Sequence, residues 1–307
     1  MPHGVGPRSS TLTCIKTWYR ASRPFTLPAS VVPVLVGSAL AFQEGRASLH
    51  LFFLVLVASL LVQIATNLVD EYADHARPEA TRKHAAPYKV ISLGLLSAGA
   101  VKLGAVVCFG VATAIGLYLV FIASWPILVI SLASLAVAYA YAAGPYPLGS
   151  LGIGQVLVFI FMGPVMVMGA YYVHTQAVTL EGLVVSIPVA CIVTAILVAN
   201  DLRDVEEDRA SGKVTPVTLM GRNRAVWFWL SLVLVAYVVV AGLAVVGDLS
   251  LAPLLAFLSL PMSARAFRSL WHQEERVLLA RGLRYSATQH MWFGVLLALG
   301  VAVGRFY

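Results

Sequence analysis

The sequence predicts an all-α integral membrane protein whose transmembrane helices surround a central cavity that opens toward the cytoplasmic side. Hydrophobic residues make up 60% of the 307 residues and charged residues only 11%, whereas soluble domains carry about 25% charged residues. Apolar runs of roughly 20 residues recur along the chain, and each is long enough to cross a bilayer as a helix. The charged residues gather between these runs.

The apolar runs predict nine spans. In chain order they cover about 24–42, 51–69, 96–121, 125–143, 152–173, 180–202, 224–246, 250–270 and 285–306. Residues 1–23 are polar and basic and are expected to form a cytoplasmic N-terminal segment, and residues 24–307 a single transmembrane domain. Pro126 suits the start of the fourth span, and Pro188 and Pro261 predict mild kinks in the sixth and eighth.

The basic residues predict the orientation of these spans. With the N-terminus inside, 19 of the 21 Lys and Arg residues fall in cytoplasmic segments, and only Arg46 and Arg305 lie outside them. This asymmetry follows the positive-inside rule. The net charge of +7 therefore reflects topology and not a nucleic-acid surface. We expect a multi-pass protein of the cytoplasmic (inner) membrane with a cytoplasmic N-terminus. The oligomeric state cannot be deduced from the sequence.

Acidic residues are concentrated on the same side, where 11 of the 14 Asp and Glu residues fall. The positive-inside rule does not require this, because acidic residues contribute little to topology. The three cysteines are scattered and form neither a disulfide framework nor a metal cluster. A requirement other than topology therefore places the acidic residues on this side.

The stretch NDLRDVEEDRASGKVT, residues 200–215, follows the sixth span directly. Asp201, Asp204 and Asp208 have helical spacings of three and four, so they share one helix face. The end of the second span repeats this spacing in Asn67, Asp70 and Asp74. Duplicated halves that each bring polar groups to one site are familiar in membrane proteins.

Two acidic clusters that face one cavity repel each other unless cations lie between them. Oxygen ligands suit hard cations, and Mg²⁺ is usually held by one or two carboxylates together with substrate phosphates. Basic residues accompany both clusters and suit phosphate oxygens; they are Arg77, Arg82, Lys83 and Lys89 near the first, and Arg203, Arg209 and Lys213 near the second. A diphosphate site is indicated, with a solvated charged loop as the alternative.

These motifs resemble the UbiA superfamily of intramembrane prenyltransferases. The second aspartate-rich motif of that family, NDxxDxxxD followed by GKxT, is matched in full by residues 200–215. Within the superfamily the chain most resembles the 1,4-dihydroxy-2-naphthoate prenyltransferases of menaquinone synthesis. The similarity lies in SRPFTLPASVVPVLVGSALA (22–41), TNLVDEYAD (66–74), APYKVISLGLLS (86–97), GPYPLGSLGIGQ (144–155) and GPVMVMGAYYV (163–173).

The resemblance implies a Mg²⁺-dependent transfer of a polyprenyl group from an isoprenyl diphosphate to an aromatic acceptor. It implies that the metal ions are held by Asp70, Glu71, Asp74, Asp201, Asp204 and Asp208, of which Asp70, Asp74, Asp201 and Asp204 are expected to be catalytic. Diphosphate contacts are implied for Lys89, Arg203, Lys213, Asn67 and Asn200. The two asparagines have an alternative role in hydrogen bonding at helix ends.

The chain departs from the family pattern at a few positions. In the first motif, Asp70 stands where Asn is common and Glu71 where Asp is common. Glu79 is the nearest carboxylate to a further family Asp, and Gln155 stands where many relatives carry an acidic residue. These departures leave the acceptor open, with 4-hydroxybenzoate, homogentisate, a porphyrin or a glycerol-phosphate lipid as alternatives to the naphthoate.

Other polar features have two interpretations. Tyr139, Tyr141 and Tyr146 either flank a carbocation or belong to an interfacial belt. Arg23 contacts either the acceptor or a lipid headgroup. The basic residues from 265 to 284 are explained by contact with anionic lipid. A cation-coupled transporter is a further alternative, although its acidic groups are expected near the bilayer midplane and here they lie at helix ends.

Overall fold

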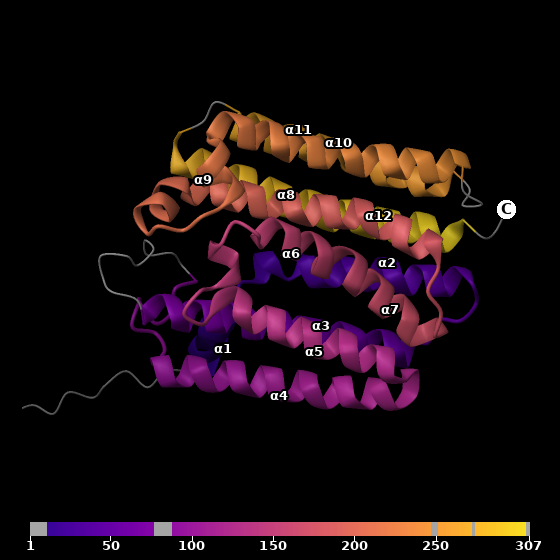
Figure 1. Ribbon diagram of the computed structural model, residues 1–307, viewed down its shortest axis with the longest axis horizontal. Coiled ribbons are helices and arrows are strands. Elements are labelled where there is room, and N and C mark those ends of the chain that lie inside the picture. Colours follow the sequence, from indigo (N-terminus) through magenta and orange to yellow (C-terminus); the bar gives the residue numbers. More distant parts are fainter. Residues whose placement is uncertain (1–10, 77–87, 247–250, 272–273, 305–307) are drawn as a thin grey trace, which may run out of the picture.

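The protein is a bundle of long helices that run side by side (Figure 1). The computed structural model describes residues 11–76, 88–246, 251–271 and 274–304. Over these residues the chain is helical apart from loops and one isolated parallel bridge between Leu151 and Val214. The sequence-based expectation of an all-α membrane protein is confirmed. Several residues of the topology argument lie outside the described ranges, namely Arg8, Arg77, Glu79, Arg82, Lys83 and Arg305.

The first half of the chain forms one side of the bundle. Its elements are α1 (Thr11–Ala21), the 3₁₀ turn η1 (Pro24–Thr26), α2 (Pro28–Gln43), α3 (Leu49–His75), α4 (Ala98–Ala123) and α5 (Trp125–Ala142). Pro24 and Pro28 stand at helix starts, where a missing N–H costs nothing. Pro33 lies inside α2.

The second half adds a broken helix, three long helices and several shorter elements. They are η3 (Leu148–Ser150), α6 (Gly154–Ile160), the π-helical turn η4 (Phe161–Val165), α7 (Met166–Thr175), α8 (Leu180–Ala210), α9 (Pro216–Met220), α10 (Arg222–Val246), the 3₁₀ segment η5 (Ala252–Ser259), α11 (Leu260–Leu270) and α12 (Arg276–Val303). Pro164 lies within η4. Because proline removes one hydrogen bond of the helical ladder, it accounts for the π turn at this position.

Eight helices in the described part of the chain are long and apolar enough to cross a membrane. They agree with eight of the predicted spans, and α8 extends the sixth to residue 210, so the acidic motif lies on the helix itself. The predicted span 250–270 consists of η5 followed by α11, each with a proline in its first turn. This segment is therefore two short helices, and the count of nine spans stays a prediction.

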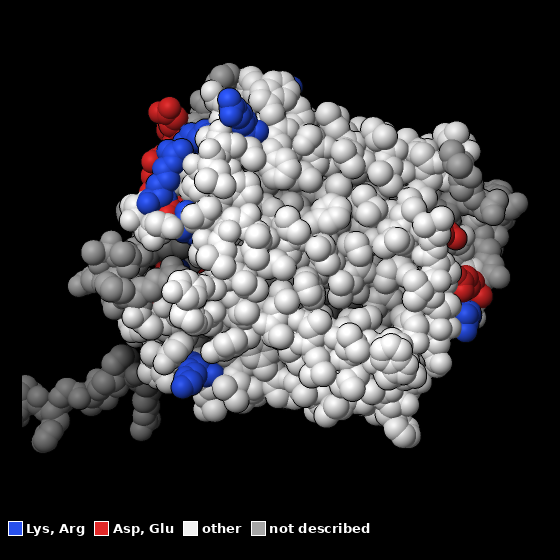
Figure 2. Space-filling model, viewed as in Figure 1, with Lys and Arg blue, Asp and Glu red and all other residues white. Residues whose placement is uncertain are grey.

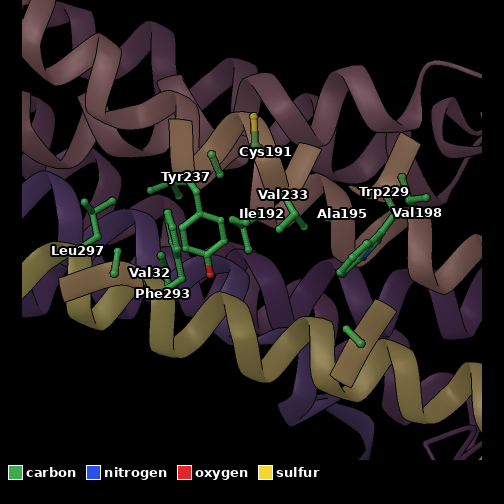
Figure 3. Packing of buried hydrophobic residues seen from close by; sticks show 14 of the residues in the cluster. Val32, Cys191, Ile192, Ala195, Val198, Trp229, Val233, Tyr237, Phe293 and Leu297 are labelled. Atoms are coloured by element: carbon green, nitrogen blue, oxygen red, sulfur yellow. The ribbon is translucent and has the colours of Figure 1, made fainter. Parts of the chain in front are cut away.

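The main hydrophobic core lies between α2, α7, α8, α10 and α12. Trp229, Tyr237 and Phe293 fill it (Figure 3), and the Trp229 indole donates a hydrogen bond to the Ser286 hydroxyl at 3.2 Å. Two glycines allow close helix contact. A Cβ on Gly163 would lie 2.3 Å from the Cβ of Ala190 in α8, and one on Gly37 would lie 2.3 Å from the Val167 carbonyl oxygen.

The molecular surface is apolar between two polar ends. On the face that Figure 2 shows, Lys, Arg, Asp and Glu gather at the end where α8 meets α9, with a smaller group at the opposite end. The surface between them is almost free of charge. Such a belt matches the hydrocarbon layer of a bilayer, and it identifies a multi-pass membrane protein.

Candidate active site

A cavity of about 460 Å³ lies inside the bundle and connects the two acidic clusters. We define the first acidic cluster as Asn67, Asp70, Glu71 and Asp74 on α3, and the second as Asn200, Asp201, Asp204 and Asp208 on α8. Both clusters contribute to the cavity wall, through Asn67 and Asp70 on one side and Asn200 and Asp204 on the other. Lys89, Arg203 and Lys213 also line it. The rest of the wall is mostly apolar.

Each carboxylate of the first cluster has its own partner. Lys89 Nζ lies 2.5 Å from Asp74 Oδ2, with both side chains buried. Glu71 Oε1 accepts the backbone N–H of Ile91 at 2.9 Å. Asp70 Oδ2 pairs with Arg23 Nη1 at 2.8 Å. The segment 89–91 is thereby attached to α3, which places Lys89 beside the cluster.

Arg23 occupies a strained position that the ion pair explains. Its backbone is left-handed, with φ 51° and ψ 67°, and such a conformation in a non-glycine residue costs on the order of 1–3 kcal/mol. The guanidinium lies 4.7 Å from the centroid of the Tyr88 ring, a favourable cation–π distance. Burial alone lowers the pKa of Arg23, but the nearby Asp70 carboxylate outweighs burial and raises it. Arg23 therefore remains charged at the cavity wall.

The Asn67 side chain holds the turn that precedes the first span. Its amide donates to the backbone oxygen of Ser22 at 3.0 Å and to the Thr26 hydroxyl at 2.9 Å. Helix-end hydrogen bonding, one of the two roles open for this residue, is thus present. Asn200 differs, since its side-chain oxygen accepts from Arg203 Nη2 at 2.9 Å.

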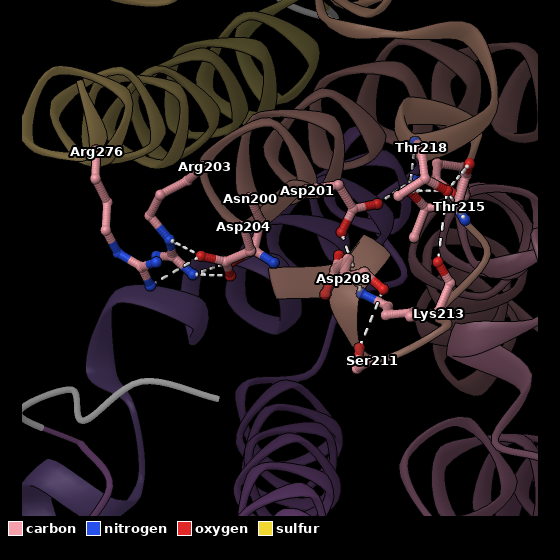
Figure 4. Close-up of polar contacts among 11 residues, drawn as sticks. Asn200, Asp201, Arg203, Asp204, Asp208, Ser211, Lys213, Thr215, Thr218 and Arg276 are labelled. Atoms are coloured by element: carbon pink, nitrogen blue, oxygen red, sulfur yellow. Dashed lines mark hydrogen bonds and ion pairs between the residues drawn. The ribbon is translucent and has the colours of Figure 1, made fainter. Parts of the chain in front are cut away.

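Two arginines bind Asp204 at the cavity wall (Figure 4). The Arg203 guanidinium donates from Nε at 2.7 Å and from Nη2 at 2.5 Å to the two carboxylate oxygens. Arg276, at the first residue of α12, donates to Asp204 Oδ1 at 3.2 Å and also bonds Glu207. The basic pattern of residues 265–284 indicated lipid contact for Arg276. The packing of α12 against α8 instead brings it to the second cluster.

Lys213 neutralises the inner carboxylates of the second cluster. Its ammonium lies 3.0 Å from Asp208 Oδ2 and 3.5 Å from Asp201 Oδ1. Burial alone lowers the pKa of Lys213, but the carboxylates of Asp201 and Asp208 outweigh burial and raise it. The lysine is therefore a fixed positive charge at the cavity wall.

Gln155 binds the same cluster from another helix. Its amide nitrogen donates to Asp201 Oδ2 at 2.6 Å, with both side chains buried. The adjoining loop is held by two backbone bonds, from Gly152 N to Val214 O at 2.9 Å and from Val214 N to Ser150 O at 3.1 Å. These bonds connect the 144–155 segment to the GKVT segment. A neutral amide at position 155 therefore avoids placing one more carboxylate beside Asp201.

Comparison with known proteins identifies the chain. The model of the UbiA prenyltransferase family matches residues 30–288. The chain belongs to this family. The 1,4-dihydroxy-2-naphthoate octaprenyltransferase of Bacillus subtilis (strain 168) is 32% identical over 288 residues, which are 94% of this chain and 93% of the relative. UbiA prenyltransferase domain-containing protein 1 of Mus musculus is 30% identical, with 91% of this chain and 83% of the relative covered.

Solved structures of UbiA proteins share the fold. A UbiA homologue from Archaeoglobus fulgidus bound to GPP and Mg²⁺ matches with a TM-score of 0.59 and 15% identity over 92% of this chain and 99% of that chain. The apo structure of a UbiA homologue from Aeropyrum pernix K1 matches with a TM-score of 0.62 and 17% identity, covering 90% and 97%. The sequence-based resemblance to the UbiA superfamily is confirmed.

The donor atoms in this UbiA site suit a divalent cation, although no three Asp, Glu, His or Cys side chains among the described residues converge as a metal cage. Magnesium rarely needs such a cage, because substrate phosphates and waters complete its shell. Glu71 Oε2 is buried without a hydrogen bond to any described residue and lies 3.9 Å from Arg23 Nη2. A buried carboxylate oxygen that accepts no hydrogen bond is suited to bind a cation.

The predicted site residues divide by their access to the cavity. Asp70, Asp204, Asn67, Asn200, Lys89, Arg203 and Lys213 line it, whereas Glu71, Asp74, Asp201 and Asp208 are buried beside it. Among the three tyrosines only Tyr141 lines the cavity, and Tyr139 and Tyr146 are exposed. The sequence pattern did not indicate the Arg276 and Gln155 contacts, because both join elements distant in sequence.

Proposed function

We propose that the chain transfers a polyprenyl group from an isoprenyl diphosphate to 1,4-dihydroxy-2-naphthoate, with loss of diphosphate and of the acceptor carboxylate, in menaquinone biosynthesis. The observation that carries this proposal is the meeting of two acidic clusters, from α3 and α8, at one cavity together with Lys89, Arg203 and Lys213. Similarity over nearly the whole chain to naphthoate octaprenyltransferases supports the choice of acceptor.

The donor diphosphate binds between the two clusters in this proposal. The metal ligands would be Asp70, Glu71, Asp74, Asp201, Asp204 and Asp208, and bound Mg²⁺ would supply positive charge that stabilises the departing diphosphate. Lys89, Arg203 and Lys213 neutralise further charge on its oxygens, and their present ion pairs with Asp74, Asp204 and Asp208 keep them at the cavity until the donor arrives. Asn67 and Asn200 orient the metal ligands or the diphosphate.

The reaction breaks the bond between the donor's C1 carbon and its diphosphate oxygen, and both electrons leave with the diphosphate. The resulting allylic cation is attacked by the electron-rich ring carbon that carries the carboxylate, which forms the new carbon–carbon bond. The carboxylate then leaves as CO₂, and its bonding electrons restore the aromatic ring. The apolar cavity wall keeps water away from the cation during this step.

The membrane orientation completes the proposal. The N-terminus and the acidic clusters lie on the cytoplasmic side of the inner membrane, and the cavity opens toward that side. The positive-inside distribution of Lys and Arg supports this orientation, as does the gathering of charge at the α8–α9 end of the molecule (Figure 2).

An in vitro assay tests the proposed function. The purified protein is incubated with Mg²⁺, a polyprenyl diphosphate and one acceptor at a time, and products are identified by mass. We expect a decarboxylated prenyl naphthoquinol from 1,4-dihydroxy-2-naphthoate, and no product after EDTA treatment. Preferred turnover of 4-hydroxybenzoate, homogentisate, a porphyrin or a glycerol-phosphate lipid would contradict the acceptor, and turnover in EDTA would contradict the metal.

A further inference from the structure

A polar side chain, Gln63, lies in the middle of α3 and lines the otherwise apolar part of the cavity. It does not belong to the charged motifs at the helix ends. An amide inside the membrane is costly unless its hydrogen-bonding groups find partners. Such residues mark functional sites more often than chance would place them there. The partners of Gln63 are therefore informative.

Only the oxygen of the Gln63 amide has a hydrogen-bond partner among the described residues. The Ser30 hydroxyl on α2 donates to Gln63 Oε1 at 3.5 Å, and Ser30 also lines the cavity. No described residue accepts a hydrogen bond from Gln63 Nε2, which can donate two. Two other polar residues of this wall are satisfied locally, since Ser59 and Thr66 donate to the Leu56 and Val62 carbonyls of α3 at 2.9 and 2.8 Å.

The position of Gln63 relative to the acidic cluster defines what it can contact. It shares a helix face with Asn67 and Asp70, at separations of four and seven residues. At a rise of 1.5 Å per residue, Gln63 lies about 6 Å from Asn67 and about 10 Å from Asp70 along the α3 axis, toward the N-terminal end of the helix. The apolar wall continues from the clusters past Gln63 along α3, so a diphosphate bound at the clusters would direct its prenyl chain, and with it the reacting carbon, toward Gln63.

We propose that Gln63, oriented by Ser30, donates a hydrogen bond to a ring hydroxyl of the aromatic acceptor. The inference rests on the proposed function. The prenyl tail has no hydrogen-bonding group, and the diphosphate is held by charged residues nearer the helix end. The groups left to accept a hydrogen bond from Gln63 are those of the aromatic substrate, and of these the two ring hydroxyls persist through the reaction while the carboxylate leaves. A site that hydrogen-bonds a substrate hydroxyl discriminates strongly against analogues that lack it, because the protein group is then left unpaired.

The test compares Gln63→Leu with wild type and uses Ser59→Ala as the matched control, since Ser59 lines the same wall but bonds its own helix. Steady-state kinetics are measured for donor and acceptor separately. Acceptor binding is also measured by calorimetry without donor. In Gln63→Leu we expect the acceptor KM and Kd to rise about tenfold, the scale of one lost hydrogen bond, with the donor KM unchanged. Ser59→Ala should match wild type in the acceptor KM, the acceptor Kd and the donor KM.

Acceptor analogues that lack either the 1-hydroxyl or the 4-hydroxyl extend the test to a double-mutant cycle, in which the side chain and the substrate hydroxyl are removed singly and together. For wild type, loss of the bonded hydroxyl should weaken acceptor binding about tenfold, and in Gln63→Leu the same loss should have little further effect, which identifies the pair as coupled. An unchanged acceptor KM, or a full penalty for both analogues in the variant, would overturn the inference. Absence of naphthoate prenylation by wild type would instead reject the proposed function itself.

Discussion

At the level of single residues, the carboxylates of the second acidic cluster differ in their access to the cavity. Asp204 lines the cavity and is bound by Arg203 and Arg276, whereas Asp201 and Asp208 lie beside it and are bound by Lys213. The spacing in the sequence predicts one common helix face but not this division. Depth on a helix face depends on what packs against it, and here Gln155 of α6 covers Asp201.

Replacement of Asp204 by alanine is expected to lower kcat/KM by about 100-fold or more, because a group that holds charge at the reacting centre is lost. Turnover with Mg²⁺ and thermal unfolding are measured together. Glu206→Ala is the control, since Glu206 is an exposed neighbour that pairs only with Arg209 and Arg222 among the described ion pairs. Comparable activity in the two variants would contradict the role of Asp204.

Replacement of Lys213 by alanine should raise the KM for the diphosphate donor while leaving the acceptor KM unchanged, since this ammonium belongs to the diphosphate end of the cavity. The protein should also become less stable, because Asp201 and Asp208 lose a buried cation. Lys213→Arg should recover part of both effects. Kinetics with each substrate varied in turn check this, and a defect limited to the acceptor KM would oppose the assignment.

At the level of elements, the break between α6 and α7 shapes the cavity wall. Phe161, Met162, Val165 and Met166 in and beside η4 line the cavity. Pro164 accounts for the irregular turn, and Gly163 lets it approach α8. The sequence contains both the proline and the glycine, but its apolar run predicts one unbroken span from 152 to 173. The π turn itself could not be predicted, because a proline inside a helix can also produce a simple kink.

Gly163→Ala is expected to destabilise the protein by about 1–3 kcal/mol, since its Cβ would overlap the Cβ of Ala190. The double variant Gly163→Ala, Ala190→Gly removes the nearest clashing atom but leaves the Cα of residue 190 at 2.9 Å, so it should recover part of the loss. Thermal unfolding in detergent measures both. Gly110→Ala on α4, where the new Cβ meets no atom within 4 Å, serves as the control. Equal destabilisation of the single and double variants would show that this contact is not the cause.

At the level of the whole molecule, the ion pairs cross between elements far apart in the chain. Arg23 before α2 reaches Asp70 on α3, and Arg276 of α12 reaches Asp204 on α8. The two acidic clusters therefore meet at one end of the bundle with cations from several elements around them. This arrangement stabilises the carboxylates in the absence of bound metal, because each buried negative charge has a basic neighbour.

The orientation of the whole bundle can be measured by cysteine labelling. The background variant has Cys14 and Cys108 replaced and keeps the buried Cys191. A single cysteine is then introduced in place of either Arg46 or Arg209. Both positions are exposed, and they lie at opposite ends of the bundle. A membrane-impermeant maleimide should label position 46 in intact cells and position 209 only after the membrane is opened. The reverse pattern would invert the orientation proposed from the Lys and Arg distribution.

Composition and local periodicity were sufficient for the class of protein, for most of the spans and for the two acidic helix ends, because hydropathy and helical spacing are properties of neighbouring residues. The NDxxDxxxD motif with GKxT also identified the family. The tertiary structure alone decided which of these carboxylates reach the cavity, which arginines accompany them, and that Gln63 lines the apolar wall. These features depend on how helices distant in the chain pack together, and no local pattern encodes that packing.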